Sequence, residues 1–107
     1  MNIFQGQNFD LFIQLSQGGT PVPGVISSDI VMRWWRPGDT SVAVRPILPE
    51  EWVELGDGDY VLKLPGTDVS KTGILFIRLT GSLFDIHEEE FMVEPAPLSF
   101  LASANIS

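Results

Sequence analysis

The feature that most constrains this chain is a two-residue alternation of side chains, in short segments that glycine and proline separate. Residues 9–15 show it most clearly, because every second residue from Phe9 to Leu15 is large and apolar. Successive side chains of a strand point to opposite faces, so this pattern indicates a strand that is buried on one face. Comparable segments lie at 29–36, 41–48, 52–55, 60–64, 74–80 and 84–94. The chain is therefore predicted to be all-β.

Turn-forming residues fill the gaps between these segments. Glycines and prolines make 17–24 a loop, Pro37-Gly38 forms the centre of a turn, and 56–59 (Gly-Asp-Gly-Asp) predicts a hairpin. Pro46 lacks a backbone donor, which marks 41–48 as an edge strand. One helical turn is expected at 68–71. We expect no longer helix before residue 95.

About seven short strands at spacings of roughly ten residues are typical of an immunoglobulin-like antiparallel β-sandwich. A small barrel with the same number of strands is the alternative, and periodicity does not separate the two. A chain of 107 residues is expected to form one domain, which we place at 1–94. It has no cysteine, so no disulfide can bridge the sheets as in antibody domains.

The charge balance argues against two classes of partner. Six Lys and Arg against fourteen Asp and Glu give a net charge of −8, which repels phosphate backbones and anionic lipid headgroups. No segment approaches the roughly 18 apolar residues of a membrane span, and the first residues do not resemble a signal peptide. We therefore expect a protein made in a cytosol that binds neither nucleic acid nor membrane.

Residues 95–107 form a tail of different composition. It carries no charged residue, and its large apolar residues are Leu98, Phe100, Leu101 and Ile106. Disordered tails are usually polar or charged, so an uncharged apolar tail is expected to be covered. It either covers a sheet edge or open core end of its own domain or docks on a neighbouring subunit. We take it as a docking arm.

No residue pattern indicates a catalytic site or a cofactor-binding site. The only histidine, His87, lies on a predicted strand beside Glu89, which is an ordinary arrangement for an exposed strand. The chain contains neither a Gly-x-Ser-x-Gly nucleophile motif nor a Gly-x-x-x-x-Gly-Lys phosphate loop. The chain is therefore predicted not to be an enzyme, with no catalytic residue and no cofactor-binding residue.

Two acidic segments are weak candidates for a metal site. On a strand, Glu88 and Glu90 share one face and Glu89 faces the other way, so the three carboxylates do not converge. The 56–59 segment lacks the other ligand positions of a calcium loop and suits a hairpin turn. We predict no metal.

The pair Trp34-Trp35 is the strongest indication of a binding surface. Adjacent residues of a strand point to opposite faces, so one tryptophan is expected in the core and the other outside, near Arg33 and Arg36. Aromatic residues and arginine are enriched in protein interfaces. We predict an interface at Trp35, Arg33 and Arg36. The competing interpretations are tryptophans that serve only the core, and an exposed ring that stacks on a sugar.

Several segments together resemble a known kind of domain. They are Phe9-Asp10-Leu11-Phe12-Ile13-Gln14-Leu15, Gly19-Thr20-Pro21-Val22, Asp29-Ile30-Val31-Met32, Gly56-Asp57-Gly58-Asp59-Tyr60-Val61-Leu62, Gly73-Ile74-Leu75-Phe76-Ile77 and Phe91-Met92-Val93. Over about residues 5–94 the chain looks like the immunoglobulin-like modules of tailed-bacteriophage virion proteins of the baseplate, tail or decoration type.

The resemblance implies a non-enzymatic structural subunit of a phage particle, as capsid decoration, a tail or baseplate component, or a connector. It implies other virion proteins and copies of the chain itself as partners, and residence in the virion after synthesis in the host cytoplasm. It supplies no catalytic or ligand-binding residue. The alternative function is that of a carbohydrate-binding β-sandwich that recognises a host glycan.

Overall fold

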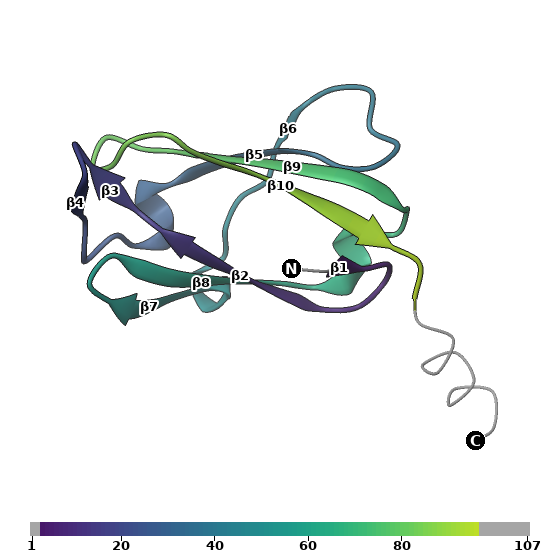
Figure 1. The fold of residues 1–107 in the computed structure, drawn as a ribbon, viewed down its shortest axis with the longest axis horizontal. Coiled ribbons are helices and arrows are strands. Elements are labelled where there is room, and N and C mark those ends of the chain that lie inside the picture. The colour runs from purple at the N-terminus through teal and green to yellow at the C-terminus, as the bar shows by residue number, and fades with distance from the viewer. Residues whose placement is uncertain (1–2, 97–107) are drawn as a thin grey trace, which may run out of the picture.

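Residues 3–96, which the computed structural model describes, form ten short β-strands and three single turns of 3₁₀-helix (Figure 1). In chain order the elements are β1 (Ile3–Phe4), β2 (Phe9–Gln14), β3 (Ser16–Gln17), β4 (Thr20–Pro21), η1 (Ser27–Asp29), β5 (Val31–Trp35), β6 (Ala43–Val44), η2 (Pro49–Glu51), β7 (Trp52–Gly56), β8 (Asp59–Leu64), η3 (Gly66–Asp68), β9 (Gly73–Thr80) and β10 (His87–Glu94). This part of the chain contains no α-helix. The all-β prediction is confirmed.

The strands build two main sheets that lie face to face (Figure 1). One sheet has the order β1-β10-β9-β5-β6 and the other the order β2-β8-β7, while β3 and β4 pair as a separate small ribbon. Immunoglobulin domains join strands B, E and D in one sheet and strands G, F and C in the other. The strands β2, β8 and β7 have the first arrangement, and β10, β9 and β5 have the second. The fold is therefore the sandwich and not the barrel.

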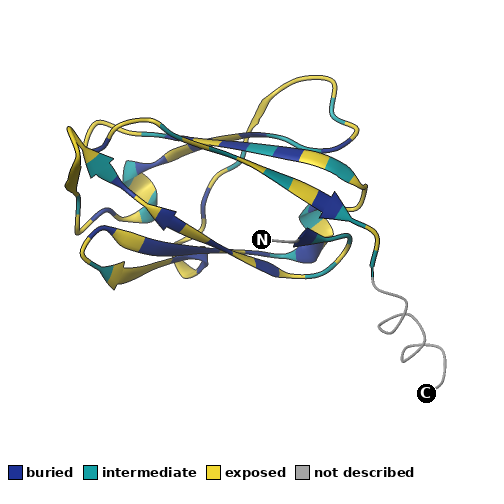
Figure 2. Cartoon of the chain, in the orientation of Figure 1, coloured by how far each residue is buried: buried dark blue, intermediate teal, exposed yellow. Residues whose placement is uncertain are grey.

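The core lies between the two sheets and is built by the predicted alternation. In β2 the residues Phe9, Leu11 and Ile13 are buried, and the residues between them are exposed (Figure 2). The other sheet contributes the same pattern from β5 and β9, with Trp34, Leu75 and Ile77 turned inward. Each inward side chain removes apolar surface from water, and this burial is the main favourable contribution to folding.

The hairpin predicted at 56–59 is present and has the backbone that a two-residue connection requires. Its central residues Asp57 and Gly58 both have positive φ, at 53° and 82°. Such values match the strand twist, and they favour Asp-Gly and Asn-Gly pairs. A Cβ at Gly58 would lie 2.9 Å from the Leu15 carbonyl oxygen, so the close approach of the two loops also requires glycine here.

Trp52 and Tyr60 hold the loop before η1 against the core. Their rings stack with centroids 4.7 Å apart. The Tyr60 hydroxyl donates to the Val22 carbonyl at 2.6 Å and accepts from the Val25 amide at 3.1 Å, and the Trp52 indole donates to the Val25 carbonyl at 2.9 Å. Burial raises the pKa of the Tyr60 hydroxyl. These hydrogen bonds satisfy polar groups that the loop would otherwise bury unpaired.

Several details differ from the sequence prediction, and one is the short β3–β4 ribbon within the loop expected at 17–24. The strand expected at 41–48 shortens to β6, at the edge of its sheet, and the helical turn expected at 68–71 forms at Gly66–Asp68, directly after Pro65. The last strand begins at His87 and not at 84, and Phe84, which precedes it, is buried in the core. A parallel strand, β1, pairs with β10 at the sheet edge. A strand of two residues is too short to show an alternation of apolar and polar side chains, so β1 could not be recognised in the sequence.

Residues 3–96 include no helix that is long and apolar enough to cross a membrane. The predicted docking arm at 95–107, with Leu98, Phe100, Leu101 and Ile106, lies outside the described residues apart from its first two positions.

Candidate protein interface

Strand β5 sends its two tryptophans to opposite sides of the five-stranded sheet. Trp34 is 3% exposed and belongs to the core, whereas Trp35 is half-buried and lies on the outer side with Arg33. The alternation of β5 thus brings two of the three predicted interface residues, Trp35 and Arg33, to one face.

Neighbouring strands add residues that sequence reasoning did not place at the interface. The strand register puts Trp35 opposite Phe76 of β9, which in turn lies opposite Glu90 of β10. One step along the strands, Arg33 lies opposite Arg78, and Arg78 opposite Glu88. We call this surface the Trp35 face. Its exposed aliphatic side chains are those of Val31, Ile74 and Met92. The whole face comprises Val31, Arg33, Trp35, Ile74, Phe76, Arg78, Glu88, Glu90, Met92 and Glu94.

The charges of the Trp35 face are unevenly paired. Arg78 lies 3.5 Å from Glu88, and its guanidinium lies 5.7 Å from the centroid of the Phe76 ring. Arg33 donates only a long hydrogen bond, 3.4 Å, to the Thr80 hydroxyl, and within residues 3–96 it contacts no carboxylate. Like charges directly opposite each other on a sheet are unfavourable. A carboxylate supplied by a partner would relieve the Arg33–Arg78 pair.

Arg36, the third predicted interface residue, lies elsewhere. Its guanidinium is 5.1 Å from the centroid of the buried Trp34 ring and donates to Asp39 at 3.1 Å and to the Asp68 carbonyl at 3.3 Å. Hydrogen bonds from the Arg36 backbone amide and side chain lower the pKa of Asp39. The structure therefore separates Arg36 from Trp35 and gives it intramolecular partners that hold the 36–39 turn.

A second arginine, Arg45, forms a half-buried cluster that the sequence did not indicate. It pairs with both oxygens of buried Glu51 and with Asp68 at 2.9 Å, and its guanidinium lies 5.6 Å from the Trp34 ring centroid. Hydrogen bonding to Arg45 lowers the pKa of Glu51, and hydrogen bonding to Glu51 raises the pKa of Arg45. The cluster ties β6, η2 and η3 to the core, so its role is structural.

Other polar groups of residues 3–96 pair with near neighbours in the chain. His87 hydrogen-bonds to Glu89 at 2.6 Å, as the shared strand face predicts. A polar hollow of about 230 Å³ lies beside the 36–39 turn, but Arg36 and Asp39 pair with each other there and Lys71 lies against Gly38. In the part of the chain that the structure describes, no three His, Asp or Glu side chains gather closely enough to hold a metal ion.

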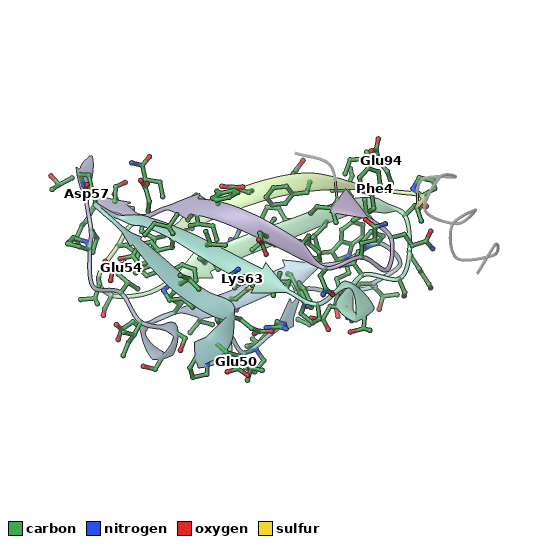
Figure 3. All side chains as sticks on the ribbon, turned by 90° about the horizontal axis from the view of Figure 1, so that it is seen from below. Phe4, Glu50, Glu54, Asp57, Lys63 and Glu94 are labelled. Carbon is green, nitrogen blue, oxygen red and sulfur yellow. The ribbon has the colours of Figure 1, made fainter. Side chains whose placement is uncertain are left out.

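The opposite sheet also presents an apolar surface. Phe12, Val61 and Val53 lie side by side across β2, β8 and β7, and Leu55 lines the same hollow as Phe12. We call these four residues the Phe12 face. Phe12 is 66% exposed, and the ring has Asp10 and Lys63 nearby on the same strands, 4.0 Å apart. Figure 3 shows this side of the molecule, with Lys63 on the sheet and Asp57 at the tip of the β7–β8 hairpin.

Comparison with known proteins yields similarity of structure only. No family model and no curated protein matches the chain. One similar solved structure is a Bacteroides vulgatus ATCC 8482 protein provisionally assigned as a glycoside hydrolase, with a TM-score of 0.49, 13% identity, and coverage of 91% of this chain and 17% of that one. Another is the twitchin kinase region of C. elegans, with a TM-score of 0.41, 13% identity, and coverage of 90% and 14%. The chain thus spans less than a fifth of either protein.

Proposed function

We propose that the chain is a non-enzymatic structural subunit that acts by binding other proteins through the Trp35 face, and that it serves in a tailed-phage particle. The observation that carries the proposal is the composition of this face. Trp35 and Phe76 lie side by side at its centre, aliphatic Ile74 and Met92 extend it, and arginines border it. Aromatic residues, Met and Arg are the residues enriched in protein interfaces.

The energetics support a binding role for this face. A partner that covers Trp35 and Phe76 removes apolar ring surface from water, worth about 25 cal/mol per Å² before the costs of association. Arg33 adds specificity, because it has no carboxylate partner in residues 3–96 and favours a partner that brings one. The assignment to a phage particle rests on the resemblance of the turn and core segments to immunoglobulin-like phage modules.

Site-specific photo-cross-linking tests this proposal. A benzophenone amino acid replaces Trp35 in the full chain, which is expressed in the infected host, and the cross-linked products are identified by mass spectrometry. We expect cross-links to proteins of the purified particle. The matched control carries the same amino acid at Phe12, on the other sheet. Absence of the chain from particles would refute the phage assignment, and equal cross-linking from both positions would refute the choice of face.

A glycan-binding function is the second candidate, because the half-buried Trp35 ring lies in one cross-strand row with Glu90, a combination of aromatic platform and carboxylate. Tryptophan fluorescence during titration with host surface glycans distinguishes the two functions. A saturable change in the wild type that is absent in Trp35→Ala would favour glycan binding over protein assembly.

A further inference from the structure

We propose that the partner on the Trp35 face is a second copy of the same chain, packed sheet to sheet about a twofold axis that runs parallel to β9. This inference rests on the proposed function, because it uses the same face, and it specifies the partner. The charges of the face are distributed unequally over the three central strands of the sheet, and this distribution favours a second copy as the partner.

The Trp35 face carries only a small share of the chain's negative charge. Its arginines are Arg33 and Arg78, and its glutamates are the three on the outer side of β10, which leaves a net charge of −1 on the face against −8 for the whole chain. Two copies repel each other through most surfaces at low salt. They can approach through this face while bringing little excess negative charge together.

The charges are also segregated by strand. The carboxylates lie on β10, the arginine without a carboxylate lies on β5, and β9 between them carries Phe76 and Arg78. A twofold axis along β9, in the plane between two sheets, preserves position along the strands and reverses their order across the sheet. It therefore places β10 of one copy over β5 of the other, an aligned packing of the kind that β-sandwiches use between their sheets.

This arrangement places β10 residues over β5 residues of opposite character in both rows of the face, whereas each β9 residue faces its own copy. Glu88 of each copy lies over Arg33 of the other. The dimer therefore contains two such pairs, and each Arg33 gains one carboxylate partner. In the next row Glu90 lies over Trp35 of the second copy, whose indole N–H is a hydrogen-bond donor. Phe76 packs on its own copy at the axis. Arg78, also at the axis, faces Arg78 of the second copy, and Glu88 of its own chain, 3.5 Å away, offsets this like-charge contact.

Complementary charge reversal tests this geometry. Arg33→Glu leaves only carboxylates at the paired positions, and Glu88→Arg leaves only arginines. Each single variant should therefore repel itself, with a dissociation constant for self-association raised about tenfold or more. An equimolar mixture of the two variants restores both pairs, and the double variant Arg33→Glu/Glu88→Arg restores them within one chain. We expect sedimentation equilibrium of the full chain to show dimers for the wild type, the mixture and the double variant.

Controls separate this inference from the proposed function. Lys63→Glu, an equal charge reversal on the opposite sheet, should leave the dimer unchanged, and circular dichroism should show every variant folded. A dimer that both single variants retain, or one that the mixture does not restore, overturns the proposed pairing. A wild type that stays monomeric at all concentrations overturns the self-partner, while cross-links from position 35 to other particle proteins would then leave the proposed function standing.

Discussion

The two sides of β5 use the same kinds of residue for different purposes. On the inner side Trp34 is buried, and the guanidinium groups of Arg36 and Arg45 lie 5.1 and 5.6 Å from its ring centroid. On the outer side Trp35 lies half-buried beside Phe76, with Arg33 on the same face. A tryptophan with nearby arginines therefore does not by itself define a binding site.

The difference lies in how completely each side is paired. Arg36 and Arg45 have carboxylate partners in Asp39, Glu51 and Asp68, whereas Arg33 has none within residues 3–96. Satisfied groups contribute to the stability of the fold, and unsatisfied ones are available to a partner. Substitutions on the inner side should therefore lower the free energy of unfolding, and those on the outer side should change association.

Replacement of the two tryptophans should give the largest contrast. Trp34→Ala creates a cavity in the core and should lower the free energy of unfolding by about 3–5 kcal/mol, a large share of what a small domain has. Trp35→Ala should lower it by about 1 kcal/mol or less and should weaken self-association instead. Urea denaturation measures the first effect and sedimentation the second. Equal losses of stability in both variants would contradict the division between the two sides.

Removal of the buried carboxylate is expected to have the next largest effect. Glu51→Ala leaves Arg45 without its bidentate partner and should cost about 1.5–3 kcal/mol, the range for hydrogen bonds to charged groups. The neighbouring Glu50 is exposed, so Glu50→Ala is a matched control with an expected change within about 0.5 kcal/mol. Urea midpoints of the two variants that coincide would show that the Arg45 cluster contributes nothing.

The same carboxylate predicts a smaller, pH-dependent effect. Its pKa in the folded protein lies below the ordinary glutamate value of 4.5. The stabilisation is therefore complete above about pH 5, where the group is ionised in both states. As the pH falls below 4.5, the unfolded chain takes up a proton first, and the stabilisation is lost until the folded group is protonated too. The stability difference between wild type and Glu51→Gln should shrink between pH 5 and pH 3 in urea titrations.

The smallest effect on stability is expected for the outer carboxylates. Glu88→Lys and Glu90→Lys alter exposed groups, one of which pairs with half-exposed Arg78, so the free energy of unfolding should change by about 0.5 kcal/mol or less. Thermal or urea denaturation at a concentration where the chain is monomeric measures this. A loss of several kcal/mol would show that these carboxylates support the fold and not an interface.

Much of the sandwich could be predicted from local patterns. Alternation located β2, β5, β8 and β9, and the pair Asp57-Gly58 located a hairpin, because strand faces and tight turns depend on neighbouring residues alone. The same rule predicted that the side chains of Trp34 and Trp35 would point to opposite faces of the sheet. It did not predict β1, which exists only because β10 offers it a parallel edge.

The sequence by itself determined which residues alternate, where the chain turns, and the charge of the whole chain, since these are properties of neighbours and of composition. Only the tertiary structure decided which strands became neighbours. Strand register placed Phe76 and Arg78 beside Trp35 and Arg33. The segment between β6 and η2 folds back on itself and places Glu51 against Arg45. Periodicity says which face a side chain occupies but not what lies across from it, because cross-strand pairing joins segments far apart in the chain.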